Sequence, residues 1–117
     1  LTYFFMLTID DVIDICEEGY EISLTNQPPS FYPIAMGYIE PDKSLINIYV
    51  DNIPSMKEYN ITLLHEFIHA KNELGGFADH LFNEEDLFEV DAVETYNKTP
   101  EVAEFIIDLY DLKNEKF

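Results

Sequence analysis

Residues 65–69 of this 117-residue chain read His-Glu-Phe-Ile-His, which is the HExxH pattern. Residues four apart on a helix lie about 40° apart around its axis and one turn apart along it, so His65 and His69 can both reach one metal ion. Glu66 lies beside them and can serve as a general base. The spacing therefore predicts a metal centre carried by a single helix.

Two histidines leave the centre one ligand short. A catalytic zinc usually takes three protein ligands and keeps a fourth position for water, and two imidazoles with one carboxylate suit that ion. The single cysteine, Cys16, lies far upstream of the pattern. The remaining candidates all follow it in the sequence, namely His80, Glu84, Glu85, Asp86, Glu89, Asp91 and Glu94.

The helix that carries the pattern has clear ends. Ser55 and Glu58 form a capping pattern directly after Pro54, and Gly75-Gly76 provides a stop. Apolar residues recur between them at helical spacings, which predicts a buried stripe and a central position for this helix. The stripe consists of Met56, Tyr59, Leu63, Phe67 and Leu74.

The segments before this helix predict a first helix and three strands. The helix begins at Thr8, which forms a capping box with Asp11, and residues 20–25 alternate as a half-buried strand does. Residues 34–40 and 45–50 predict a hairpin, with Pro41 and Asp42 in its turn.

Two helices are expected after the pattern. Asn83 and Asp86 are candidate caps for a helix over residues 84–97, and Thr99-Pro100 is expected to cap and open the last helix. The whole chain, 1–117, is therefore predicted to be one α+β domain. Its expected order is an N-terminal helix, a sheet of about three strands, the HExxH helix, an acidic helix and a C-terminal helix.

Composition excludes several classes of partner. The formal net charge is −18, from 24 acidic and 6 basic residues, and every basic residue is a lysine. Phosphate contacts need clustered Lys and Arg, so we expect no nucleic-acid partner. The apolar residues 1–7 are too few to span a bilayer and lack the features of a signal peptide, so we expect no stable membrane insertion and a cytoplasmic location.

The HExxH pattern together with Glu89-Val90-Asp91-Ala92 resembles the gluzincin metallopeptidases. In that group a downstream glutamate helix supplies the third ligand, often as Glu-x-x-Ala followed by Asp or Asn. The order of elements is similar to that of the stand-alone minimal gluzincins, or minigluzincins, and of the membrane-peptidase and ImmA/IrrE-type families. The chain departs from the pattern at Val93, where the family often has the Asp or Asn that orients the first histidine.

The resemblance implies a zincin-like domain and a zinc endopeptidase. Zinc would be held by His65, His69 and Glu89, with Glu94 and Asp91 as alternative third ligands. Glu66 would be the general base that activates water. His80 and Tyr96 are candidates for an additional donor to the oxyanion.

The substrate is expected to be a peptide or protein that binds as an extended strand, with residues 34–39 or 45–50 as the receiving edge. The resemblance also implies that the segment after Pro100 inhibits the cleft in a zymogen-like manner. The competing interpretation is a non-catalytic or latent acidic binding module with a vestigial zinc site.

Overall fold

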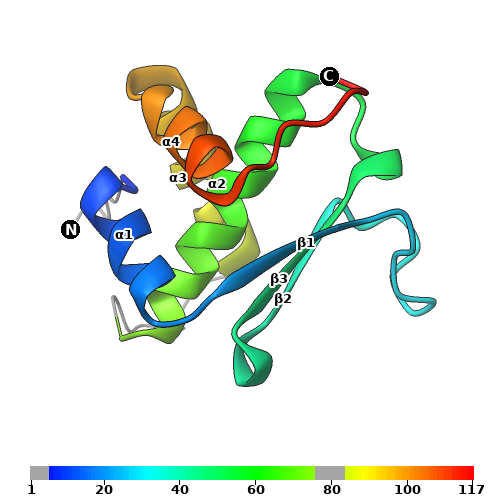
Figure 1. Cartoon of the computed structure of the whole chain (residues 1–117), viewed down its shortest axis with the longest axis horizontal. Helices are drawn as coiled ribbons and strands as arrows, with labels where there is room; N and C mark the ends of the chain where they lie inside the picture. The colour runs from blue at the N-terminus through cyan, green and yellow to red at the C-terminus, as the bar shows by residue number, and fades with distance from the viewer. Residues whose placement is uncertain (1–5, 76–83) are drawn as a thin grey trace.

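The computed structural model describes residues 6–75 and 84–117. Within these residues it contains four α-helices and one three-stranded sheet (Figure 1). The helices and strands follow one another in the expected order, so the predicted α+β class is confirmed. Two short 3-10 turns, Pro41–Lys43 and Val50–Asn52, flank the third strand.

The sheet places its third strand in the middle. Strands β1 (Glu21–Thr25), β2 (Gly37–Glu40) and β3 (Leu45–Tyr49) are ordered β1-β3-β2. β3 pairs antiparallel with β2 and parallel with β1. The alternative in which residues 45–50 form an open edge is therefore wrong, because β1 occupies that side. β2 is an edge strand, as the other alternative expected.

β2 begins at Gly37, three residues later than the sequence predicted. The side-chain amide of Asn52 donates hydrogen bonds to the carbonyl oxygens of Pro33 and Ala35, at 2.9 and 2.8 Å. These two carbonyl groups are thus bound by a side chain instead of by β3. The segment before Gly37 becomes an anchored loop that leads into the edge strand.

Two of the predicted helix starts are reproduced. α1 (Ile9–Glu17) begins at Thr8, which forms the full capping box with Asp11. α2 (Met56–Glu73) begins after Ser55, whose hydroxyl accepts a hydrogen bond from the backbone N–H of Glu58. Gly75 follows α2 at φ +90°, a conformation that favours glycine and ends the helix.

α2 carries most of the predicted apolar stripe into the core. Tyr59, Leu63 and Phe67 are buried. The prediction is wrong at the two ends of the stripe, where Met56 is 46% and Leu74 is 43% exposed. Both residues lie at the ends of α2, beyond the elements that pack against its middle. The helical repeat alone therefore predicts too long a buried stripe.

The two later helices are α3 (Glu84–Lys98) and α4 (Glu101–Tyr110). Pro100 is the N-cap of α4 and not its first helical residue. The expected cap at Thr99 is wrong, because its hydroxyl donates back to the carbonyl of Thr95 at 3.1 Å. Asn83, the other expected cap, lies outside the described residues.

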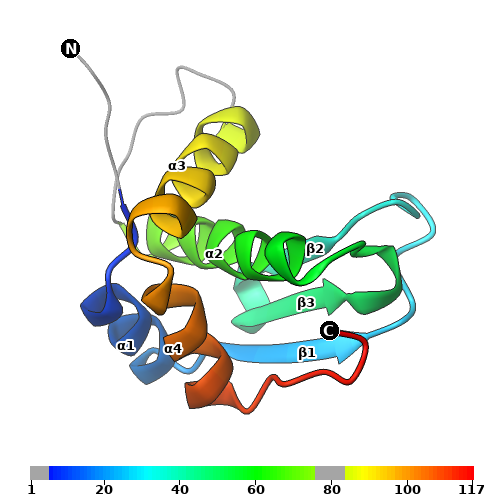
Figure 2. The ribbon, with the colours of Figure 1, turned by 90° about the horizontal axis from the view of Figure 1, so that it is seen from above.

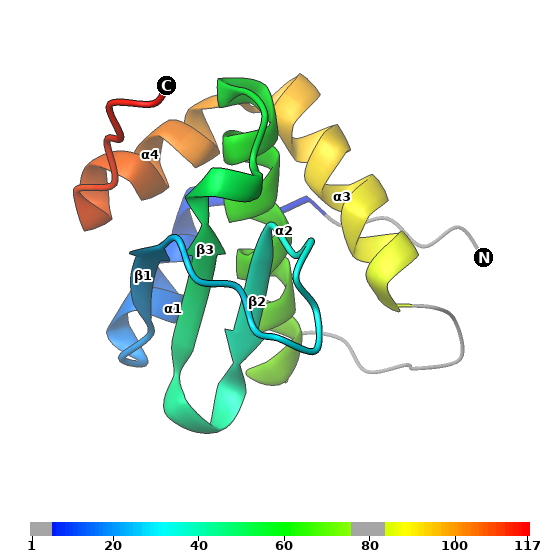
Figure 3. The same ribbon diagram turned by 90° about the vertical axis from the view of Figure 1, so that its right-hand side faces the viewer.

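α2 is the central element of the domain. It contacts β2, β3 and the other three helices, with the sheet on one face (Figure 2) and α3 on the opposite side from α1 and α4 (Figure 3). Leu63, Leu64 and Ile68 on α2 are completely buried, as are Ile46 and Ile48 on β3. No described helix, α2 included, is long and apolar enough to cross a membrane.

Candidate metal centre

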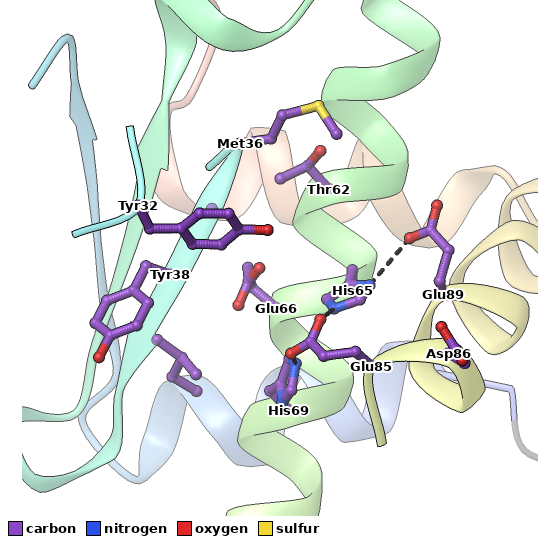
Figure 4. Close-up of a pocket in the computed structure, with 12 residues that line it drawn as sticks. Tyr32, Met36, Tyr38, Thr62, His65, Glu66, His69, Glu85, Asp86 and Glu89 are labelled. Atoms are coloured by element: carbon purple, nitrogen blue, oxygen red, sulfur yellow. Dashed lines mark hydrogen bonds and ion pairs between the residues drawn. The ribbon is translucent and has the colours of Figure 1, made fainter. Parts of the chain in front are cut away.

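Two pairs of side chains, each four residues apart, face one another across α2 and α3 (Figure 4). The carboxylate of Glu85 contacts both histidines, with Oε2 at 3.0 Å from His65 Nε2 and Oε1 at 2.8 Å from His69 Nε2. Glu89 contacts the other nitrogen of the first ring, with Oε1 at 3.0 Å from His65 Nδ1. Glu85 and Glu89 of α3 therefore contact different nitrogen atoms of the His65 ring.

The ligand atoms of His65, His69 and Glu85 all lie within 4.8 Å of one another, close enough to hold a metal ion. In a tetrahedral site with bonds of about 2.0–2.1 Å, neighbouring ligand atoms lie about 3.3 Å apart. The two contacts between Glu85 and the rings, at 3.0 and 2.8 Å, are a few tenths of an ångström shorter than this spacing. This donor set, two imidazoles and one carboxylate, fits zinc.

The structure differs here from the expectation that Glu89 is the third ligand. Glu85 faces the two Nε2 atoms, whereas Glu89 binds Nδ1 of His65. A histidine that binds a metal usually donates its other N–H to a carboxylate or carbonyl, which fixes the orientation of the ring. Glu89 occupies that orienting position, which the sequence left to Asp91, Glu94 or a backbone carbonyl.

Among the described residues, the other candidate ligands do not belong to the group that contacts the two histidines. Asp91 is almost fully buried, at 5% exposure, and Glu94 pairs with Lys98 at 3.1 Å. Asp86 lines the neighbouring cleft but is not a member of the metal-binding group. His80 and the side chain of Glu84 lie outside the described part of the chain.

Ion pairing determines the protonation of the first histidine. Burial by itself would lower the pKa of His65, but the hydrogen bonds to Glu85 and Glu89 outweigh it and raise that pKa to about 10. The bonds from His65 and His69 in turn hold the pKa of the Glu85 carboxyl well below its usual range. Without a metal, His65 is therefore an imidazolium held between two carboxylates.

Glu66 lies in a different environment on the same helix. Its side chain points toward β2 and is only 6% exposed, and burial raises its pKa to about 7 against the opposing effect of His65 and His69. A Cβ atom placed on Gly37 would lie 2.8 Å from Glu66 Oε2. The backbone of the edge strand therefore lies directly against this carboxylate. Sequence reasoning missed Gly37, although a glycine inside a strand often marks such a close approach.

An open cleft of ≈520 Å³ joins these groups. One wall is α2 with His65, Glu66 and His69, and the facing walls are α3 and the segment from Tyr32 to Ile39. Tyr96 does not line the cleft and packs against the core instead. Residues 100–117 do not line it either, so the expected inhibitory segment makes no contact there.

Comparisons of the chain with models of protein families, with curated proteins and with solved structures found no match. The resemblance to gluzincins therefore rests on the motif and its neighbours alone.

Substitution of the two α3 acids should separate ligand from orienting residue. Glu85→Ala should weaken zinc binding by more than 100-fold, whereas Glu89→Ala should weaken it by about 10- to 100-fold, the range expected for a group that orients a ligand. Zinc affinity would be measured by competition with a chromophoric chelator. Asp86→Ala, on the same helix and cleft, is the matched control and should bind zinc as the parent does. The reverse ranking of Glu85 and Glu89 would assign the ligand to Glu89.

Zinc affinity should also depend on pH across an unusually wide range. Metal binding must displace the proton of His65, and this proton stays bound up to a pH near its raised pKa of about 10. Apparent affinity should therefore rise about tenfold per pH unit between pH 6 and 9. An ordinary histidine, with a pKa near 6.5, would give a plateau above about pH 7. Titration of zinc at several pH values measures the slope, and a plateau from pH 7 upward would contradict the ion-paired state.

Proposed function

We propose that this protein is a zinc-dependent peptidase that hydrolyses peptide bonds with Glu66 as the general base. The observation that carries the proposal is the position of Glu66. It is a buried carboxylate between two candidate metal ligands on its own helix and the backbone of an edge strand at Gly37. A peptide paired to that strand would pass directly over both the metal and the base.

Three side chains would hold the ion, namely His65, His69 and Glu85, and Glu89 would fix the ring of His65. Bound zinc supplies Lewis acidity there, which lowers the pKa of water and polarises the scissile carbonyl group. Phe88 contacts the ring of His69 edge-on, with 4.7 Å between ring centroids, and supports its orientation. The ligands thus lie on two helices that are already packed together.

The outer edge of β2 supports binding of an extended peptide. In antiparallel pairing, every second residue directs its backbone N–H and C=O toward the partner strand. The register pairs Tyr38 with Asn47, and Tyr49 donates to the carbonyl of Met36 at 2.9 Å. The backbone groups of the residues between, Gly37 and Ile39, therefore face the cleft. They are available for β-augmentation by a substrate.

Glu66 has the proton affinity that its proposed role requires. It would accept a proton from the attacking water and pass it to the leaving amine, which restores the carboxylate. A general base works best with a pKa near the operating pH, and burial raises that of Glu66 to about 7. Because Gly37 has no side chain, the carboxylate of Glu66 can lie directly against the backbone of the edge strand, where the substrate would pair.

The direct test is a comparison of the zinc-loaded protein with its Glu66→Gln variant on a library of short peptides. The parent should cleave part of the library and lose activity when zinc is chelated. Glu66→Gln keeps the shape of the side chain but removes the base, so it should lose at least about 100-fold in kcat while it binds zinc as before. A zinc-loaded parent that cleaves nothing would instead favour the non-catalytic module, and equal turnover by the variant would refute the role of Glu66.

Gly37→Ala should impair the same step through geometry. The added Cβ would lie 2.8 Å from Glu66 Oε2, so the carboxylate must move. A displacement of about 1 Å in a catalytic group can cost on the order of 100-fold in rate. We expect kcat to fall by about that factor, with zinc affinity and thermal unfolding unchanged because neither the ligands nor the core is altered. Full activity of Gly37→Ala would show that the close approach is not required.

A further inference from the structure

The proposed reaction would be assisted by a hydrogen-bond donor to the reacting carbonyl oxygen, in addition to the metal. Addition of water to a peptide carbonyl produces a tetrahedral intermediate with negative charge on oxygen, and donors aimed at that charge commonly accelerate the reaction. Among the described residues that line the cleft there is no lysine, and the chain contains no arginine. His65 and His69 would be occupied as metal ligands, and the other charged side chains that line the cleft are acids, so a further donor has to be neutral.

Three lining side chains carry a hydroxyl group, namely Tyr32, Tyr38 and Thr62. Figure 4 shows the ring of Tyr32 extending across the cleft toward α2, with its hydroxyl between Thr62 and Glu66. The hydroxyl of Tyr38 points the opposite way, and Tyr38 packs edge-on against Phe31. Thr62 belongs to α2 and is only 6% exposed. Tyr32 is therefore the accessible neutral donor that points into the cleft.

The loop that carries Tyr32 is anchored on both sides of the ring. The backbone N–H of Tyr32 donates to the carbonyl of Pro29 at 2.9 Å, and its own carbonyl accepts from Ala35 at 3.2 Å. Asn52 then holds the next carbonyl groups, those of Pro33 and Ala35. The side chain itself is 48% exposed, so the ring can adjust to a substrate while its backbone stays in place.

We infer that Tyr32 is a catalytic residue that donates its phenolic O–H to the negatively charged oxygen of the tetrahedral intermediate. The proton stays on the phenol throughout, so no bond at Tyr32 forms or breaks. The inference rests on the proposed peptidase function and gives Tyr32 the role for which the sequence suggested His80 and Tyr96; Tyr96 does not line the cleft, and His80 lies outside the described residues. Asn52 acts as a positioning residue, because it holds the loop from which the ring extends.

Tyr32→Phe tests this role, with Tyr38→Phe as the matched control in the same cleft. Loss of one such donor typically costs on the order of 100-fold in kcat. We expect that loss in Tyr32→Phe, with KM and zinc affinity unchanged, and parental kinetics in Tyr38→Phe.

A phosphinic peptide, which mimics the tetrahedral anion, should bind more weakly to zinc-loaded Tyr32→Phe by a similar factor. Glu66→Gln, which does not cleave the substrate peptide, should bind that peptide with the same affinity as the double variant Glu66→Gln/Tyr32→Phe.

The role of Asn52 is tested by a double-mutant cycle. Asn52→Ala should lower kcat, and Tyr32→Phe should add little to the loss in the Asn52→Ala background, because both changes remove the same interaction. Additive losses would overturn the link between the two residues.

Three results would overturn the role of Tyr32, namely an unchanged kcat in Tyr32→Phe, an effect on KM alone, or equal losses in Tyr32→Phe and Tyr38→Phe. In each of these the parent still cleaves peptides, so the peptidase proposal survives. A zinc-loaded parent that neither cleaves peptides nor binds the phosphinic peptide would refute both proposals together.

Discussion

The carboxylate of Glu85 is the group on which the arrangement of the centre depends. It contacts both histidines of α2 from α3, a separate helix that packs against α2. Each imidazole is only 13% exposed, and burial of such a group without a partner would be costly. The same face of α3 that supplies the charge also packs Phe88 and Ala92 into the core. Packing and polar pairing thus fix one register between the two helices.

The site holds two carboxylates whose surroundings give them opposite properties. Glu85 faces the open cleft, with its side chain 67% exposed, and its pKa is lowered by the two histidines. Glu66 lies one residue from His65 but points toward β2, where burial raises its pKa. A carboxylate that stays ionised suits a metal ligand, whereas one with a pKa near neutrality suits proton transfer. The opposite shifts in pKa follow from which side of α2 each carboxylate occupies.

Local sequence signals predicted the elements and the first half of the centre. The capping residue Thr8 and the turn at Pro41 are local chemistry, and the spacing of His65 and His69 follows from the helical repeat. The choice between Glu85 and Glu89 has no such signal. These two residues are four apart on one face of α3, so the sequence allows either to face the two histidines. The position of α3 along the axis of α2 determines which carboxylate lies between the two rings.

Long-range pairing explains the remaining differences. No short pattern indicates that β1 pairs in parallel with β3, and this pairing is what moves β3 to the centre and leaves β2 as the edge next to Glu66. Tyr32 lies between the strands predicted over residues 20–25 and 34–40, outside both of them. The position of Tyr32 depends on hydrogen bonds from Asn52, a residue of a turn distant in the sequence, to the segment that follows Tyr32.

The C-terminal tail ends beside the 3-10 turn that precedes α2 (Figure 1). Lys116 donates from Nζ to the carbonyl of Val50 at 2.8 Å, and the ring of Phe117 stacks on that of Tyr59 with 4.8 Å between centroids. Val50 opens the 3-10 turn that ends at Asn52, the residue that holds the cleft loop. The tail therefore contacts the turn that leads to Asn52, whereas residues 100–117 do not line the cleft. A chain shortened at this end would lose the contacts that hold the 3-10 turn and, through Asn52, the loop beside the cleft. Trimming would therefore weaken the site, whereas removal of an inhibitory segment would open it.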